Sequence, residues 1–220
     1  IKTMLTFAEE ITLLALDDKT GELMRLPERS LDFALAGSLM LELAFMGRID
    51  TDETFVAVLS REPTGDRLLD EAMMLIPDGP GVAIENALAR IAKKGDRWER
   101  KTLDGLVEKG VLMKREDRFL WVMRERTYPV ADEKPLREVR ERIRAVVMNP
   151  DAIPSPRDVV IIALMNACEL NFTVFDADEA ERYRDRIDTI SKMDFIAQAV
   201  ADSISEIQNA ILETVAFSGL

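Results

Sequence analysis

The spacing of apolar and polar residues along the chain predicts a mainly helical protein. In most segments apolar residues recur every three or four positions, which places them on one side of a helix. Residues 31–46 are apolar on nearly every side, so we expect that helix to lie at the centre of the fold. The predicted helices cover residues 7–16, 31–46, 67–76, 82–92, 97–109, 135–147, 157–167, 177–190 and 194–217.

Several predicted helix ends carry local signals. Thr6 and Glu9 have the spacing of a capping box, in which two side chains bond to free backbone amides of the first turn. Ser30 and Asp66 are predicted to cap the helices that follow them. Gly47 is predicted to end the central helix, because glycine adopts the left-handed conformation at low cost.

Strand signals are fewer. Residues 55–59 predict one strand, and the segments Val111–Lys114 and Phe119–Met123 predict a β-hairpin with its turn at Arg115–Arg118. Because this turn lacks an Asn-Gly pair, the register of the hairpin stays open. The predicted fold class is therefore mainly α, with a single helical domain over residues 1–220, a central core helix, amphipathic helices around it and one β-hairpin.

Composition supports one domain with a sizeable core. The chain has 220 residues, of which 47% are hydrophobic and 32% are charged, and these proportions are typical of globular proteins. The longest apolar runs, 39–46 and 159–165, are far shorter than the roughly 20 residues that a membrane span needs. The sequence begins at Ile1 rather than Met, which predicts a fragment or a processed form.

Missing residue types exclude several kinds of site. The chain has no histidine, which excludes Ser-His-Asp and Cys-His catalytic sites and His-bound metals. Its one cysteine, Cys168, excludes intrachain disulfides, so we expect a reducing, cytosolic compartment. Cys168 follows an apolar helix and is expected to be a small buried side chain rather than a reactive thiol.

Carboxylate pairs are the remaining candidates for catalysis or for holding a divalent cation. They occur at Glu9–Glu10, Asp70–Glu71 and Asp176–Glu179. Each pair lies near the start of a predicted helix, where acidic side chains complement the helix dipole. The chain also has no glycine-rich phosphate-binding loop. We therefore expect no enzymatic activity, no metal and no cofactor.

Charge is distributed unevenly along the chain. The formal net charge is −12, which argues against nucleic acid as a partner. Residues 90–144 differ from the rest, because they hold 17 basic and 11 acidic residues, against 7 and 17 in residues 1–89 and 5 and 13 in residues 145–220. An acidic protein with such a segment can present a cationic face. The alternative is that these basic residues only decorate solvated helix surfaces.

Two helices within this basic segment are candidates for binding. Trp98 lies among Arg97, Arg100 and Lys101, and an indole beside guanidinium groups can cradle an anionic headgroup or lie at a lipid interface. An ordinary, partly buried helix aromatic is an equal alternative for Trp98. The second helix is basic and amphipathic, with cations at helical spacing at positions Arg137, Arg140 and Arg144.

A series of short motifs, in a fixed order, resembles the Golgi phosphoprotein 3 family. Its members are peripheral membrane proteins that recognise phosphatidylinositol 4-phosphate. The resemblance implies a compact helical domain with a projecting β-hairpin and no enzymatic activity. The motifs are Leu5-Thr6, Glu9-Glu10, Leu13–Leu16, Leu35-Ala36-Gly37, Leu41–Ala44, Gly47-Arg48-Ile49, Pro63–Asp66, Leu68–Ala72, Leu106–Leu112 and Tyr128-Pro129.

The resemblance also implies where a lipid headgroup binds. The family's pocket uses a loop Trp, a helix Arg and two later Arg, and these positions align with residues of other types here, namely Pro27, Ala36, Asp96 and Glu99. A shift of one position brings in Arg97 and Arg100, which keep the family's spacing. We therefore expect an anionic-lipid site without strict selectivity for phosphatidylinositol 4-phosphate. Its expected residues are Arg97, Trp98, Arg100, Lys101, Arg25 and Arg29.

In the family, the hairpin is associated with membrane insertion and self-association. The corresponding residues here are Lys114, Arg115, Arg118, Phe119, Leu120 and Trp121. We expect a non-enzymatic, cytoplasmic protein that associates peripherally with anionic membrane lipid. The alternative is a cytosolic adaptor that self-associates through the hairpin and binds the tails of client proteins. An enzyme that uses carboxylates is a third, weaker alternative.

Overall fold

The computed structural model describes residues 4–27, 29–119 and 123–218, and this part of the chain is mainly helical. Most predicted helices are present. The exception is the predicted 177–190 helix, which is interrupted at Tyr183. The helices are α1 (Phe7–Leu14), α2 (Ser30–Phe45), α3 (Arg67–Met73), α4 (Ile84–Ala92), α5 (Gly95–Glu108), α6 (Glu133–Met148), α7 (Pro156–Ala167), α8 (Ala177–Arg182), α9 (Arg184–Ser191) and α10 (Phe195–Ser218).

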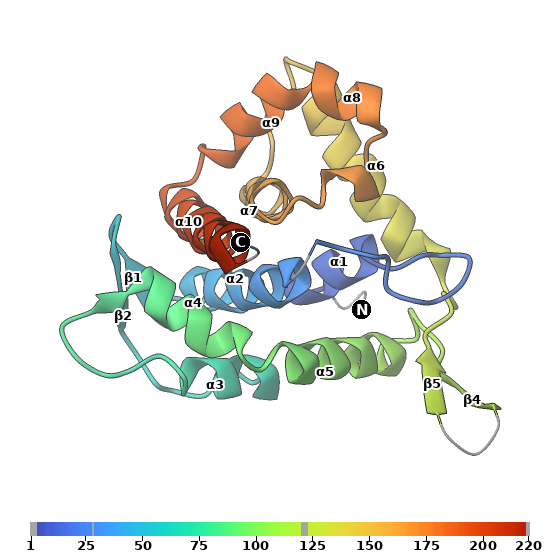
Figure 1. Ribbon diagram of the computed structural model, residues 1–220, viewed down its shortest axis with the longest axis horizontal. Coiled ribbons are helices and arrows are strands. Elements are labelled where there is room, and N and C mark those ends of the chain that lie inside the picture. The colour runs from blue at the N-terminus through green and yellow to red at the C-terminus, as the bar shows by residue number, and fades with distance from the viewer. Residues whose placement is uncertain (1–3, 28, 120–122, 219–220) are drawn as a thin grey trace.

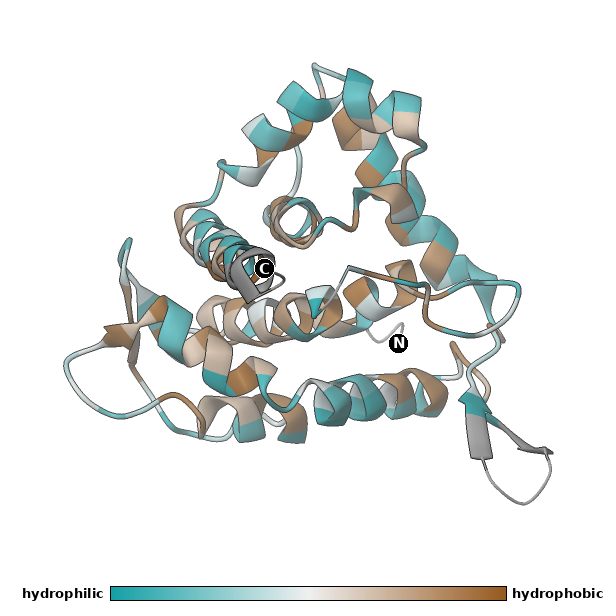
Figure 2. Ribbon diagram, in the orientation of Figure 1, coloured by the Kyte–Doolittle hydropathy of each residue, from teal (hydrophilic) through white to brown (hydrophobic). Residues whose placement is uncertain are grey.

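Helix α2 lies at the centre of the fold, as its sequence predicts. It contacts α1, α3, α4, α5, α7 and α10, and Figure 1 shows it between α5 on one side and α7 and α10 on the other. In Figure 2 it is coloured in pale and brown tones along its length, whereas α8 and α9 carry much teal. Gly37 lets α7 pack closely against α2, because a Cβ at this position would lie only 2.6 Å from Leu164 Cδ2.

Local capping signals predict most of the helix ends correctly. The capping box of Thr6 and Glu9 is present, and the Asp66 carboxylate accepts hydrogen bonds from the first turn of α3. The prediction that Ser30 caps α2 is wrong. Arg29, in the left-handed conformation, precedes the helix, and Ser30 is its first residue, with a buried hydroxyl that has no partner among the described residues.

A small antiparallel sheet covers one end of the bundle. Its strands follow the order β1 (Ile49–Thr51), β2 (Phe55–Val58), β3 (Val82–Ala83). The sequence predicts β2 correctly. It misses the outer two, which contain only three and two residues and are too short to show an alternating pattern. Their backbone pairing with β2 defines them, with Ile49 opposite Val58 and Val82 opposite Val56.

The β-hairpin is present, but its strands lie later in the chain than predicted. Strand β4 (Arg115–Phe119) pairs with β5 (Met123–Thr127), so the segment predicted as the turn forms the first strand. The residues before β4 have other backbone partners at the base of the hairpin. The amide of Met113 donates to the carbonyl oxygen of Pro129, and Leu112 forms a β-bridge with Val130. Figure 1 shows the hairpin extending away from the helices.

No helix in these described ranges combines the length and apolar character needed to cross a lipid bilayer.

Candidate functional site

The junction of α4 and α5 gathers cationic side chains. Helix α4 ends at Ala92 and α5 begins at Gly95, so the two helices meet across two lysines. On α5 the next basic residues follow at spacings of three and four, which places them on neighbouring rows of the helix surface. We call this group the basic corner, and its members are Lys93, Lys94, Arg97, Arg100 and Lys101.

Glu71 of α3 contacts two members of the basic corner. The Nε of Arg97 donates a hydrogen bond of 2.8 Å to Glu71 Oε2, and Lys101 Nζ donates one to Oε1. The hydrogen bonds from Lys101 and Arg97 lower the pKa of Glu71 below its ordinary value. Each oxygen of this carboxylate therefore binds one cation, and Glu71 stays ionised at neutral pH.

The start of α2 meets the start of α5 at the edge of the basic corner. Arg29 Nε donates to Asp32 Oδ2 at 3.4 Å, and the guanidinium lies over the Phe33 ring. A Cβ on Gly95 would lie 1.9 Å from Asp32 Oδ1, so only glycine fits there. Asp32 thus lies between Arg29 and the first residue of α5.

Acidic side chains stand beside these cations. Burial, followed by the nearby charges of Asp96 and Asp32, raises the pKa of Glu99. Asp96 and Glu99 are the residues that align with the two later arginines of the resembled family. The surroundings of Arg29 and Arg100 are therefore of mixed charge, rather than uniformly cationic.

Trp98 does not belong to the surface of the basic corner. Its side chain is only 1% exposed, and its Nε1 donates a 2.7 Å hydrogen bond to the carbonyl oxygen of Ile91. This burial corrects the expectation that the indole cradles a headgroup and supports the core alternative. Trp98, Thr102 and Leu106 recur every four residues, a pattern that marks the inner face of α5.

Two further positions predicted near the site lie in different surroundings. Arg25 is exposed in the segment before α2, and within the described residues it has no recorded contact with the basic corner. Ala36, which aligns with the family's helix arginine, is completely buried in α2. The structure thus places Arg97, Arg100 and Lys101 on one helix and links Arg29 to the start of that helix through Asp32, whereas the described residues show no contact of Arg25 with them.

The predicted hairpin residues lie away from the basic corner. Lys114 Nζ is 3.0 Å from Asp104 Oδ1, and Arg115 begins β4 with an exposed side chain. Strand β4 contains Arg118 and Phe119, whereas Leu120 and Trp121 lie outside the described residues. The corner is at the start of α5 and the hairpin follows its end, about 20 Å away along a helix of 14 residues.

The arginines of α6 are used for contacts inside the fold. Arg142 bonds to Glu10 of α1 and to Asp158 of α7, and both carboxylates are buried. Burial raises the pKa of Glu10, and Arg142 opposes that effect. Arg140 pairs with Asp18, and Arg144 with Glu179 of α8. The basic face predicted for this helix is therefore largely neutralised, and only Arg137 is fully on the outside.

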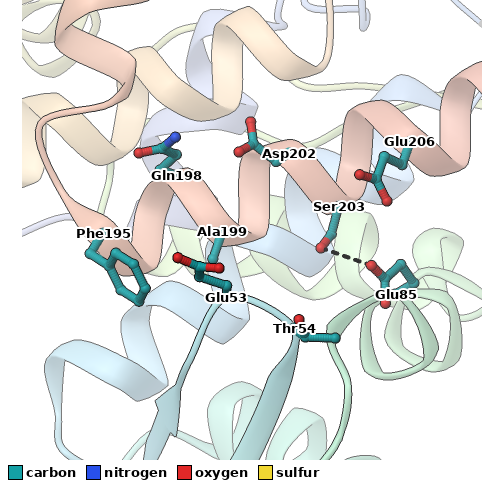
Figure 3. Close-up of a pocket in the computed structure, with 9 residues that line it drawn as sticks. All are labelled: Glu53, Thr54, Glu85, Phe195, Gln198, Ala199, Asp202, Ser203 and Glu206. Atoms are coloured by element: carbon teal, nitrogen blue, oxygen red, sulfur yellow. Dashed lines mark hydrogen bonds between the residues drawn. The ribbon is translucent and has the colours of Figure 1, made fainter.

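An acidic cleft of about 400 Å³ lies between the β1–β2 turn, the start of α4 and the first turns of α10. Figure 3 shows carboxylates on both sides of it and the Ser203 hydroxyl near Glu85, at 3.3 Å. The sequence analysis missed it because its residues come from three distant segments. No basic residue lines it, so it repels an anionic headgroup. Its lining is Glu53, Thr54, Glu85, Phe195, Gln198, Ala199, Asp202, Ser203 and Glu206.

The candidate catalytic side chains have structural contacts instead. Glu9 accepts from Lys109, and Asp70 accepts from the amide and hydroxyl of Thr64. Cys168 is completely buried, and burial raises the pKa of its thiol. The thiol is therefore not ionised at neutral pH. Among the described residues, no three acidic or cysteine side chains are grouped so as to hold a metal ion.

Comparison with known proteins agrees with the motifs in the sequence. The chain is 31% identical over 167 residues to the vacuolar protein sorting-associated protein 74 of Eremothecium gossypii, and 25% identical over 223 residues to that of Schizosaccharomyces pombe. These matches cover 66% and 86% of this chain, but only 49% and 65% of the relatives. The Golgi phosphoprotein 3 (GPP34) profile matches residues 7–207. The chain therefore belongs to the Golgi phosphoprotein 3 family.

Proposed function

We propose that this protein is a non-enzymatic peripheral membrane protein that binds anionic lipid headgroups through the basic corner. The observation that carries the proposal is the presence of five cations at the α4–α5 junction, with Arg29, which precedes α2, linked to the start of α5 through Asp32. Near an anionic membrane each basic residue contributes about 1 kcal/mol. Several such residues together are enough to hold a protein on the surface reversibly.

The hairpin is the second contact in this proposal. It extends from the fold beyond the end of α5 (Figure 1), at the opposite end of that helix from the basic corner. Two separated contacts, one of charge and one at the hairpin, orient a protein on a membrane better than either contact alone. Arg115, Arg118 and Phe119 of β4 are among the residues that the family resemblance associates with this contact.

Co-sedimentation with vesicles tests the basic corner. We expect binding to phosphatidylcholine vesicles that contain phosphatidylglycerol, weaker binding at high salt, and none to phosphatidylcholine alone. The triple variant Lys94→Gln, Arg97→Gln, Arg100→Gln should bind at least about tenfold more weakly. A matched variant, Arg182→Gln, Arg184→Gln, Lys192→Gln, loses the same charge from the distant α8–α9 region and should bind as the unmodified protein does. Equal loss in both variants would contradict the proposal.

Headgroup selectivity needs a separate comparison. Asp96 and Glu99 occupy the positions that align with the family's arginine pair, so we expect little preference for phosphatidylinositol 4-phosphate over other anionic lipids. Vesicles of matched surface charge, made with either this lipid or phosphatidylserine, measure that preference directly. Strong selection for the phosphoinositide would show that the carboxylates do not set the specificity.

The second candidate function is a cytosolic adaptor that self-associates through the hairpin. The observation in its favour is that β4 and β5 form a sheet of two strands, which leaves both outer edges free of strand partners in the described structure. Replacement of residues 115–127 by a short Gly-Ser linker, followed by measurement of the mass in solution, tests it. A fall in mass together with a lack of vesicle binding by the intact chain would favour the adaptor.

A further inference from the structure

The cations of the basic corner fall into two groups. Lys93, Lys94 and Arg100 are exposed, and the described part of the chain shows no ion pair for them. Arg97 and Lys101, one helical turn apart, both bond to the carboxylate of Glu71. The two cations of the second group are therefore already bound to an anion of the protein itself, the Glu71 carboxylate.

The carboxylate of Glu71 uses the same donors that a phosphate oxygen would use. Arg97 Nε donates to Glu71 Oε2, and Arg97 Nη2 lies 2.7 Å from the same oxygen. Lys101 Nζ bonds to the other oxygen, Oε1. Two cations on the two oxygens of one anion are the usual arrangement for binding carboxylate or phosphate. A headgroup that takes these same donors from Arg97 and Lys101 therefore has to displace Glu71.

The backbone of α3 holds Glu71 in place, while its carboxylate remains open to solvent. Leu69, Ala72 and Met73, on either side of it, are buried in the core, and Asp66 caps the helix. The side chains of Glu71, Arg97 and Lys101 are 36%, 53% and 34% exposed. Ion pairs of this exposure contribute little to folding stability. Their contribution to the fold is small, whereas the contact neutralises half of a cation pair at the candidate site.

We propose that Glu71 is a built-in counter-anion that competes with an anionic lipid headgroup for Arg97 and Lys101 and so limits the affinity of the basic corner. This inference rests on the function proposed above. It predicts that the unmodified protein binds anionic membranes mainly through Lys93, Lys94 and Arg100. Arg97 and Lys101 join only where the density of negative charge is high enough to displace the carboxylate.

The test is the variant Glu71→Gln, which keeps the shape of the side chain and removes its charge. We expect it to bind phosphatidylglycerol-containing vesicles about fivefold or more tightly than the unmodified protein, with no binding to phosphatidylcholine alone. The control is Glu181→Gln, because Glu181 also pairs with an exposed arginine, Arg184, but lies on α8. The urea concentration at the midpoint of unfolding should be nearly the same for both variants and the unmodified protein.

A double-mutant cycle shows whether the gain passes through the two cations. In the background Arg97→Gln, Lys101→Gln, the change Glu71→Gln should have no effect on vesicle binding. An equal gain from Glu71→Gln and Glu181→Gln, or a gain that persists without the two cations, would overturn the role of Glu71 and leave the proposed function intact. If neither the unmodified protein nor Glu71→Gln binds anionic vesicles, the proposed function itself fails.

Discussion

The indole of Trp98 is the largest side chain among those that the described structure buries completely. Its neighbours in the sequence are charged, whereas its neighbours in space are the apolar side chains of the core. Helical geometry explains the difference, because Arg97 lies about 100° around the helix from Trp98. Arg97 therefore contacts α3 at the surface while the indole enters the core.

Trp98→Phe separates a core role from a membrane role. The change removes the indole donor to the Ile91 carbonyl oxygen, which still accepts from the Lys94 amide, and replaces a fully buried ring by a smaller one, so it should cost about 1–3 kcal/mol of folding stability in urea unfolding. Vesicle binding should not change, since the ring does not reach the surface. A well-folded Trp98→Phe variant with much weaker vesicle binding would place the indole at the lipid.

At the scale of the elements, local signals predicted most features that depend on neighbours in sequence, although Ser30 does not cap α2. The capping box at Thr6, the Asp66 cap and the glycine at 47 each act within a few residues, and all three predictions are confirmed. Strands β1 and β3 depend on backbone partners farther along the chain, so their sequences alone do not reveal them.

The candidate site follows the same rule. The spacing of Arg97, Arg100 and Lys101 on one helix predicts that they lie close together, and the structure agrees. Their carboxylate partner on α3 is 26 residues before Arg97 in the chain, and no local pattern links the two. The sequence therefore predicts the cations of the site but not the carboxylate that neutralises two of them.

The contact of α8 with α6 gives a pH-dependent contribution to stability. Hydrogen bonds from Arg144, followed by the backbone amide at Asp176, lower the pKa of Glu179 from 4.5 to about 2. A carboxyl with a lowered pKa stabilises the folded state above its ordinary pKa, and this contribution is lost as the pH falls toward the folded value.

Glu179→Gln should therefore flatten the fall of melting temperature between about pH 4.5 and pH 2. Arg144→Gln should flatten it in the same way, because it removes the main cause of the shift. Thermal unfolding monitored by circular dichroism over this range provides the measurement. Parallel curves for the two variants and the unmodified protein would show that this contact does not control acid stability.

For the molecule as a whole, the uneven charge of the sequence has a structural explanation. The basic residues of 90–144 form ion pairs with acidic residues of both outer segments, as in Lys109 with Glu9 and Arg144 with Glu179. The middle segment thus holds the two acidic segments together. These pairs neutralise part of the cationic face expected from the charge count, so among the described residues that face is smaller than the count suggests.

Among the ion pairs described, those of Arg142 should contribute most to the folding stability. It faces Glu10 and Asp158, whose side chains are 6% and 5% exposed. Arg142→Ala removes the cation that bonds to both buried carboxylates and should cost about 3–5 kcal/mol in urea unfolding at neutral pH. Arg184→Ala, which breaks an exposed pair, should cost about 0–1 kcal/mol. Similar costs for the two variants would refute this view.

The central position of α2 has a consequence for biosynthesis. The helices that cover it include α5, α7 and α10, which leave the ribosome long after α2 itself. Until α7 has been made, Arg142 cannot bond to both Glu10 and Asp158, and the apolar surface of α2 remains partly open. A nascent chain of this protein thus exposes its most hydrophobic helix for most of its synthesis, which makes it a natural client for chaperones that bind apolar segments.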